Sequence, residues 1–263
     1  MSVQLQFALV DGIKMLPRHE NGKPLHGICP HCGGEVVAKI YQDRMSHWAH
    51  LNSEMCDKWW ESKTPWHIQW QNLFPKEWQE IRVDNSKDVD DWHIADVCTA
   101  DGLVVEFQHS HIKEEQQKER EQFYSANTKG IVWVVDIFGK RDVSKIIDII
   151  PSDVINGVQK GWWMIQLGSL TAFPKQWRNS KHIIFYDVQF DSKRYLLCMR
   201  LCMVGYKQRA FLFGIPHEEF SQIVYNCEML VTWNKNVQEA IKKWLLEHRP
   251  NPINRGFSRR RRL

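Results

Sequence analysis

The sequence predicts an α/β protein: a mixed sheet flanked by helices, preceded by a small cysteine-rich module and followed by a strand-rich extension. Residues 1–57 are rich in Gly, Pro, His and Cys, with short strand-like pieces between turn signals. Residues 58–140 alternate helical and strand-like patterns, which is typical of a sheet covered by helices. Residues 141–263 contain aromatic strand-like runs, a helical pattern and a basic tail. We therefore expect three consecutive regions with these bounds.

The bulk composition is that of an ordinary globular protein. The chain has 263 residues, of which 43% are hydrophobic and 25% charged. No run approaches the roughly 18 apolar residues of a membrane-spanning helix, and the first residues lack the features of a signal peptide. We therefore expect an intracellular, cytoplasmic protein. The net charge of +4 permits a nucleic-acid partner but does not indicate one.

The first region contains a candidate metal site. Cys29 and Cys32 form a Cys-x2-Cys turn followed by two glycines, and Cys56 lies downstream with two histidines before it. Three thiolates and one imidazole are a structural zinc set. His50 is the expected fourth ligand because it is closer to Cys56, and His47 is the alternative. A redox pair or two chance cysteines in a turn would be the competing interpretations.

The elements of the first half follow in order. "GEVVAKIY" has the pattern of a strand. Aromatic residues then recur at helical spacing from Trp59 to Gln79, so we expect one helix with an aromatic core face and with Pro65 and Pro75 as edges or breaks. "HIADVCT" and "LVVEFQ" predict a hairpin over residues 92–108, because both are β-rich and Ala-Asp-Gly joins them.

The elements of the second half are less completely defined. "IKEEQQKEREQFYSAN" predicts an amphipathic helix, and "IVWVVDIF" predicts a short buried strand. Beyond residue 140, "HIIFYDVQF", "YLLCMRLCMVGY" and "AFLFGI" predict strands, and "NVQEAIKKWLLEHR" predicts a helix. Whether these strands extend the first sheet or form a second domain is left open by the sequence.

The hairpin carries polar residues where apolar ones would pack better. Glu106 and Gln108 are two residues apart and share one face, and Asp96 on the neighbouring strand can face them. Buried carboxylates repel one another and lose hydration unless a cation lies between them. Asp96 and Glu106 are therefore candidate ligands for Mg²⁺ or Mn²⁺. Alternatively, these residues lie on a solvated face of the hairpin.

Further motifs follow one another along the first half of the chain: "CPHC", "HWAH", a cysteine, Glu61 with His67, "ADV", "VEFQHSHI", "ER", "FY" and "VWVVD". In content and order they resemble the competence protein CoiA-like nuclease family of the PD-(D/E)xK nuclease superfamily. The spacing Asp-x9-Glu-x-Gln also resembles the superfamily's catalytic signature, with Gln108 in place of the usual lysine. The resemblance covers about residues 25–138 and implies a restriction-endonuclease-like core behind a zinc-ribbon-like element.

The resemblance also implies roles for individual residues. Cys29, Cys32, His50 and Cys56 match the zinc-binding element, and the acidic Glu61 matches a residue that assists metal binding. The remaining matches are the metal-binding Asp96, the Glu106 and Gln108 pair, and four positions that contact substrate or brace the site: His67, Ser110, Arg120 and Tyr124. The chain departs from the family at Gln71, near an expected lysine, while His109 and His111 add groups with no assigned role.

The expected reaction is metal-dependent hydrolysis of a DNA phosphodiester. A divalent cation at Asp96 and Glu106 would neutralise charge in the transition state, and Gln108 would orient the attacking water. Candidate backbone contacts are Lys113, Lys118, Arg120, Arg255 and the arginines at 259–262. The tryptophans of "GWWM" could stack on unpaired bases, although packing in a core is the more common role of tryptophan.

Two other classes of function fit the same residues. A DNA-binding accessory factor would keep the fold and the zinc module but lack cleavage, as the glutamine at position 108 permits. A zinc-dependent interaction scaffold would make the hairpin acids incidental. The sequence does not distinguish competence, recombination, repair, mobile-element and defence pathways.

Overall fold

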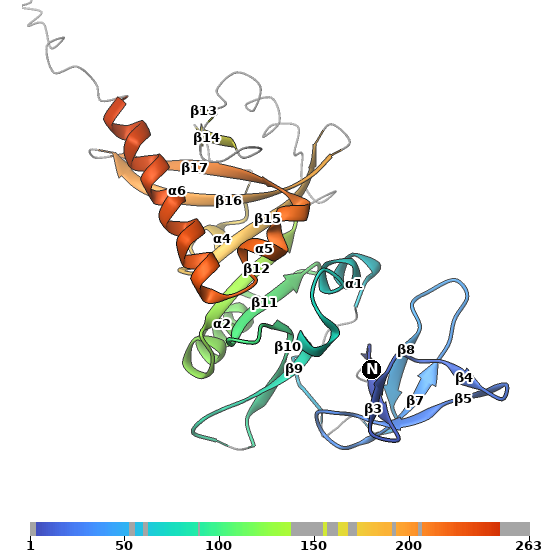
Figure 1. The fold of residues 1–263 in the computed structure, drawn as a ribbon. Helices are drawn as coiled ribbons and strands as arrows, with labels where there is room; N and C mark the ends of the chain where they lie inside the picture. The colour runs from blue at the N-terminus through green and yellow to red at the C-terminus, as the bar shows by residue number, and fades with distance from the viewer. Residues whose placement is uncertain are drawn as a thin grey trace, which may run out of the picture.

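The chain forms two main sheets joined by a short connection (Figure 1). The computed structural model describes residues 4–52, 56–59, 63–88, 90–137, 155–156, 163–167, 173–190, 193–204 and 207–247. Together the elements make a mixed α/β protein that is rich in strands and has few helices.

The N-terminal module is a small six-stranded sheet with the order β1-β8-β7-β6-β2-β3. Its core is small, and Trp48 is its largest fully buried side chain, with an indole N–H that donates to the carbonyl of Met15 at 2.9 Å. The strand predicted in "GEVVAKIY" is confirmed as β7. The strands of the module are β1 (Gln4–Leu5), β2 (Ala8–Val10), β3 (Ile13–Met15), β6 (His26–Ile28), β7 (Glu35–Lys39) and β8 (His47–His50), with the separate pair β4 (His19–Glu20) and β5 (Lys23–Pro24).

The second sheet has nine strands in the order β13-β14-β17-β16-β15-β12-β11-β10-β9. The pairs β11·β12 and β12·β15 are parallel and the other pairs are antiparallel, so the sheet is mixed. The strands are β9 (Gln79–Asp84), β10 (Trp92–Cys98), β11 (Leu103–Gln108), β12 (Gly130–Asp136), β13 (Ile155–Asn156), β14 (Trp163–Leu167), β15 (Ile183–Phe190), β16 (Lys193–Val204) and β17 (Lys207–Pro216). The strands after residue 140 therefore belong to the same sheet as the hairpin. The sequence had left open whether they form a second domain.

The predicted helix over residues 59–79 is wrong in its extent. Helix α1 spans only Pro65–Gln71, where Thr64 caps the first turn and Pro65 occupies the first helical position. A 3-10 turn, η1 (Lys76–Trp78), then leads into β9, a strand that the sequence analysis did not predict. The aromatic spacing misled because Trp59 is outside the helix and stacks on His93 with ring centroids 3.1 Å apart.

The hairpin, the following helix and the next strand are confirmed. Strands β10 and β11 pair antiparallel with Val97 opposite Val105, and Gly102 has the positive φ of +89° that the turn requires. Helix α2 (Glu114–Asn127) then returns the chain to β12, which is parallel to β11. The helix begins two residues later than the sequence pattern indicated. Strand β12 is buried along nearly its whole length, as its continuous apolar run predicts.

The N-terminal module contacts the edge strand β9 of the large sheet. The buried carboxylate of Glu80 accepts hydrogen bonds from the backbone N–H groups of Gln6 and Phe7. Lys14 reaches from the module to the carbonyl of Gln79 at 2.7 Å.

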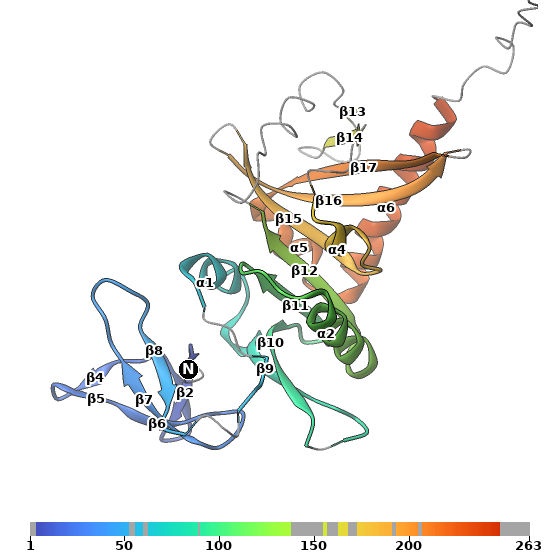
Figure 2. The ribbon, with the colours of Figure 1, turned by 180° about the vertical axis from the view of Figure 1, so that it is seen from behind.

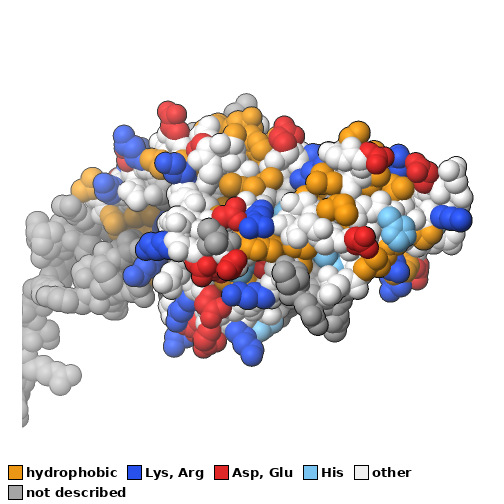
Figure 3. All heavy atoms as spheres, turned by 90° about the horizontal axis from the view of Figure 1, so that it is seen from below, with side chains coloured by type: hydrophobic (Ala, Val, Ile, Leu, Met, Phe, Trp, Pro, Cys, Tyr) orange, Lys and Arg blue, Asp and Glu red, His pale blue; other side chains and the backbone are white. Residues whose placement is uncertain are grey.

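Figure 3 shows acidic and basic side chains interspersed over one face of the molecule.

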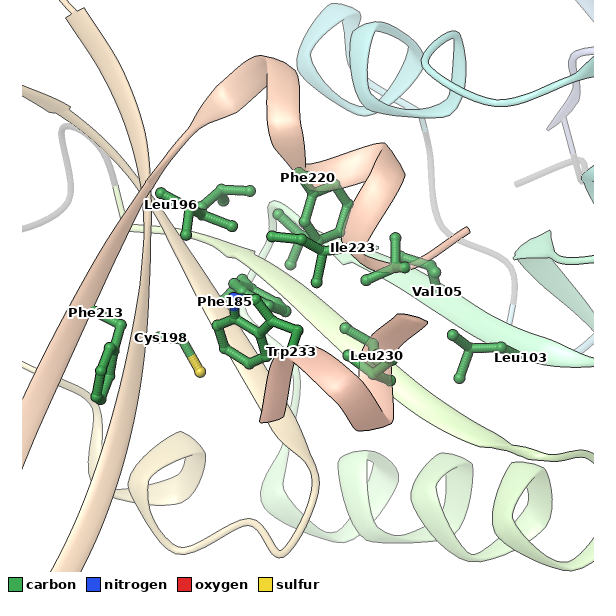
Figure 4. Close-up of a cluster of buried hydrophobic side chains, with 14 of the residues drawn as sticks. Leu103, Val105, Phe185, Leu196, Cys198, Phe213, Phe220, Ile223, Leu230 and Trp233 are labelled. Carbon is green, nitrogen blue, oxygen red and sulfur yellow. The ribbon is translucent and has the colours of Figure 1, made fainter. Parts of the chain in front are cut away.

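Helices cover both faces of the large sheet. In Figure 1, α6 (Cys227–Glu247) lies in front of the strands, and in Figure 2, seen from behind, α2 and α4 (Lys175–Arg178) lie in front. In the layer of α6 and α5 (Phe220–Ile223), Phe185 contacts both Phe220 and Trp233 (Figure 4). The 3-10 turn η2 (His217–Glu219) precedes α5. In the described part of the chain, no helix is long and apolar enough to cross a membrane.

Candidate functional site

Asp96 and Glu106 lie side by side where strands β10 and β11 separate. The ladder between the strands ends at Val97, and beyond it the Asp96 N–H donates to Glu106 Oε1 at 3.1 Å. The N–H of Phe107 donates to Asp96 Oδ2 at 3.0 Å, so each carboxylate occupies a position that a backbone carbonyl fills in a regular ladder. The side-chain amide of Gln71 on α1 binds the Asp96 carbonyl at 2.8 Å. The backbone at Asp96 is therefore held by side chains.

A third carboxylate and a lysine extend this row. Glu80 lies on β9 and has a positive φ of +49°. Its neighbours Gln79 and Ile81 pair with Val97 and Ala95, the two residues on either side of Asp96. Lys63 Nζ lies 2.6 Å from Glu80 Oε1, 3.0 Å from Gln71 Oε1 and 3.8 Å from Asp96 Oδ1. The Lys63 ammonium thus lies between the carboxylate of Glu80 on β9 and that of Asp96 on β10.

Asp96 is held in its ionised form. Burial alone would raise its pKa, but the charge and hydrogen bond of His67, at 2.8 Å from Oδ1, oppose this. Lys63 and the Phe107 N–H act in the same direction, and the net effect lowers the pKa of Asp96 to about 2. Asp96 therefore carries a negative charge at neutral pH.

The pKa of Glu106 is shifted in the opposite direction from that of Asp96. Burial and the nearby charge of Asp96 raise its pKa to about 8, although Arg120 and a hydrogen bond from Tyr124 partly oppose the shift. Arg120 Nη1 lies 3.4 Å from Glu106 Oε2, and its Nη2 donates to the carbonyl of Trp59 at 2.7 Å. Burial and the charge of Glu106 raise the pKa of Tyr124. Arg120 and Tyr124 on α2 thus brace Glu106 from the helix side.

Gln108 is buried and its amide is engaged locally. Its Nε2 donates to the carbonyl of Ser110 at 3.1 Å and to the Ser110 hydroxyl at 3.2 Å. The next residue, His109, pairs through Nδ1 with Asp136 at the end of β12, at 2.6 Å. Gln108 and His109 therefore form a fixed rim beside the acid pair.

A cavity of about 70 Å³ opens between these groups. A volume of this size holds an ion with a few waters, since a water needs only about 10–15 Å³ of probe-occupied volume. Its lining includes most of the residues that the sequence analysis assigned to the site: His67, Asp96, Glu106, Gln108, Ser110, Arg120 and Tyr124. The topology thus brings together residues from α1, two strands and α2.

The other predicted residues either do not line the cavity or fall outside the described residues. Lys113 precedes α2 and Lys118 pairs with Glu114 at 2.7 Å on its exposed face, so neither lysine lines the cavity. Glu61, the "GWW" tryptophans' side chains and the basic tail from Arg255 lie outside the described residues. The exposed His111 does not line the cavity.

The sequence analysis did not identify Lys63, Glu80 or Asp57 as site residues. All three line the cavity, and Asp57 Oδ1 lies 2.8 Å from His93 Nδ1 while Oδ2 accepts the N–H of Ile94, two residues before Asp96. A lysine was expected on the helix near Gln71. The ammonium beside Gln71 comes instead from Lys63, just ahead of the helix, a placement without a local sequence signal.

The candidate metal ligands of the N-terminal module meet at one point. The donor atoms of Cys29, Cys32, His50 and Cys56 all lie within 4.8 Å of one another, so this cluster could hold a metal ion such as zinc. His47 is not in the cluster, since its Nδ1 lies 3.3 Å from the carbonyl of Met45.

The backbone around the cluster has the form that a pair of thiolates requires. The N–H groups of His31 and Gly34 each lie 3.4 Å from a sulfur, of Cys29 and Cys32 respectively. A Cβ on Gly34 would meet Cys32 Sγ at 3.3 Å, so a larger residue would crowd the ligands. A hydrogen bond from Cys56 lowers the pKa of Cys29 to about 3, and the same contact raises the pKa of Cys56. A cation bound at the cluster would hold its cysteines as thiolates.

The cluster is connected to the acid pair through the chain. Asp57 follows Cys56 directly and binds strand β10 at Ile94, while Arg82 on β9 donates to the carbonyl of His31 at 2.6 Å. The two sites are therefore linked by strands β9 and β10.

Comparisons with protein-family models, curated proteins and solved structures find no match for this chain.

Proposed function

We propose that the protein is a metal-dependent nuclease that hydrolyses DNA phosphodiester bonds. The observation that carries the proposal is the placement of two carboxylates, of the buried Glu106 and the partly buried Asp96, on neighbouring strands, where both line one cavity and the Asp96 N–H donates to Glu106 Oε1. Two such groups in an apolar setting repel each other, and a divalent cation between them relieves that repulsion.

The sequence resemblance and the fold support the same proposal. Residues from the motifs that resemble the CoiA-like nuclease family line one cavity although they come from separate elements: Asp96 of "ADV", residues 106–110 of "VEFQHSHI" and Tyr124 of "FY". A mixed sheet with helices on both faces is compatible with a restriction-endonuclease-like core. The cysteine cluster is compatible with the zinc-ribbon-like element and a structural zinc ion.

The acid pair fits a hard divalent cation such as Mg²⁺ or Mn²⁺. Carboxylate oxygens are the ligands that these ions prefer, and because burial and the charge of Asp96 raise the pKa of Glu106, a cation there would stabilise its ionised form. Bound there, such a cation would supply positive charge to the attacking water and to the leaving oxygen of a phosphodiester.

The surrounding residues of the chain would then position substrate and water. Gln108 cannot act as a base near neutral pH, but its amide can orient a water at the rim of the cavity. Lys63 supplies the ammonium charge that the usual lysine of the signature would provide, and from its place beside Asp96 it can bind a phosphate oxygen. Arg120 and Tyr124 hold Glu106 rather than meeting the substrate, because both are buried against it.

Cleavage of labelled single-stranded and double-stranded DNA by wild type, Asp96→Asn and Glu106→Gln tests the proposal. Cleavage should require Mg²⁺ or Mn²⁺ and disappear in both variants, while the exposed-acid control Asp84→Asn should cleave normally. After treatment with EDTA, Mg²⁺ should restore cleavage and Zn²⁺ alone should not, which separates the catalytic cation from the structural one. Cleavage that survives both substitutions would contradict the proposed site.

A DNA-binding accessory factor without cleavage is the second candidate. One observation favours it: Lys63 Nζ lies 3.8 Å from Asp96 Oδ1 and Arg120 Nη1 lies 3.4 Å from Glu106 Oε2, so the pair already has cationic partners of its own. Salt-sensitive DNA binding without cleavage under any divalent cation would support this candidate.

A further inference from the structure

A second cavity adjoins the acid pair, between the N-terminal module and the large sheet. Its volume is about 310 Å³, and it is lined by residues of β1, the ends of β3 and β8, α1 and η1. Gln4, Leu5 and Lys63 line this cavity and the acidic cavity alike, so the two cavities are adjacent. We call the second cavity the module groove.

The module groove differs in chemistry from the acidic cavity. No Asp or Glu is among its described lining residues, whereas the acidic cavity has four. Phe7, Leu16, Met45 and Ile68 give it an apolar surface, and Leu16 is 49% exposed. The cationic side chains of the lining are Lys63 and Lys76.

We infer that the module groove binds the nucleotides of a single DNA strand next to the phosphodiester at the acid pair. The inference rests on the proposed nuclease function and adds a substrate class to it. Base faces pack on apolar side chains without requiring a particular sequence, and lysines meet the phosphates between them. The acids of one cavity and the apolar and cationic groups of the adjacent cavity suit a strand that runs from the cleaved phosphate into the groove.

The occupant is a single strand because a duplex keeps its bases stacked inside the helix. In a duplex only base edges and phosphates face outward, so base faces cannot reach an apolar surface such as that of Leu16 and Met45 without unpairing. The groove also has walls from two parts of the chain, since Leu16 and His47 belong to the module and Ile68 and Lys76 to the sheet side. The module therefore forms half of the strand-binding surface.

The groove walls are held in place independently of any ligand. Glu80 binds the backbone at Gln6 and Phe7, and Lys14 binds the carbonyls of Lys76 and Gln79 at 3.3 and 2.7 Å. Lys14 also lies 4.8 Å above the Phe7 ring. A preformed groove loses little conformational entropy when a strand binds.

Fluorescence anisotropy with a labelled oligodeoxythymidine, in Ca²⁺ to prevent turnover, tests the inference. Leu16→Asp should weaken binding about tenfold or more, because a carboxylate repels phosphate and removes an apolar contact. Ile13→Asp is the matched control, because Ile13 belongs to the same module, is 59% exposed and lies outside the groove lining. The affinity of this variant for the oligonucleotide should stay close to that of wild type. Met45→Asp gives a second groove variant, and circular dichroism verifies that all variants are folded.

Steady-state cleavage in Mg²⁺ separates this inference from the proposed function. The groove variants should raise KM for the oligonucleotide and leave kcat largely unchanged, because the acid pair is intact. Normal KM and affinity in Leu16→Asp and Met45→Asp, with active wild type, would overturn the groove and leave the nuclease proposal standing. Wild type that neither binds nor cleaves DNA would overturn both.

Discussion

The backbone N–H of Asp96 donates to the side chain of Glu106 at 3.1 Å, across the point where strands β10 and β11 stop pairing. The contact places one ionised and one protonated carboxyl group together, because the pKa of Asp96 is lowered to about 2 and that of Glu106 is raised to about 8. The pair therefore holds a proton at neutral pH that a divalent cation would displace.

The first prediction concerns Glu106 and pH. Burial and the charge of Asp96 raise its pKa from 4.5 to about 8, so in that interval the native state holds a proton that the unfolded chain releases. The stability of wild type should therefore fall as pH rises from about 5 to about 8. Glu106→Gln removes this pH-dependent contribution to stability. The melting temperature of the variant minus that of wild type, measured without added Mg²⁺, should therefore increase as pH rises over the same range.

Glu114→Gln is the control for that experiment. Glu114 is exposed on α2, and its pKa is lowered by Lys118, so it is ionised in both states across this range. The difference in melting temperature between Glu114→Gln and wild type should therefore not change with pH. If the difference for Glu106→Gln is also independent of pH, native Glu106 does not hold the proton.

The second prediction separates two roles of Lys63. Lys63→Met leaves the buried Glu80 without its cation at 2.6 Å, which should cost about 3 kcal/mol of stability in urea unfolding. Adding Glu80→Gln removes the unpaired charge, so the double variant should recover much of the stability. Cleavage should stay low in both variants if Lys63 binds phosphate. Wild-type cleavage by the double variant would reduce Lys63 to a structural partner of Glu80.

Lys63 and Glu80 also show where sequence reasoning ends. The hairpin, helix α2 and strand β12 were predictable because their period and turn residues are local. Lys63, Glu80 and Asp96 meet only through tertiary structure, since they come from a loop and two strands. A non-glycine residue with a φ of +49°, as at Glu80, has no signature in the sequence.

The helix expected over residues 59–79 failed for a related reason. Trp59 and Trp70 have helical spacing to their neighbours, but they pack on opposite sides of the large sheet, against Phe123 and Phe107 respectively. Periodicity does not distinguish one helix face from separate aromatic contacts. The metal cluster was easier to predict, because thiol and imidazole spacing reflects the ligand geometry directly.

The third prediction concerns metal in the N-terminal module. Cys32→Ser should lose bound zinc, measured by elemental analysis, and become sensitive to proteolysis in residues 1–57, because the module has only a small apolar core. Cleavage should also fall, since Asp57 connects Cys56 to strand β10. Cys98→Ser is the control, because Cys98 lies outside the cluster. Full zinc content in Cys32→Ser would contradict the ligand set.

The last prediction concerns the unity of the large sheet. Asp187 on β15 is buried and accepts the indole N–H groups of Trp66 at 2.6 Å and Trp70 at 3.2 Å, so a C-terminal strand holds the helix beside the acid pair. Asp187→Ala removes the acceptor of the buried Trp70 N–H and of the partly buried Trp66 N–H, which should cost roughly 3 kcal/mol. Asp187→Asn keeps an acceptor oxygen and should lose less. Urea unfolding followed by tryptophan fluorescence and circular dichroism should remain a single transition in each variant, because the strands on both sides of β12 share one core. Two separate transitions would instead show that residues beyond 140 unfold independently of the hairpin.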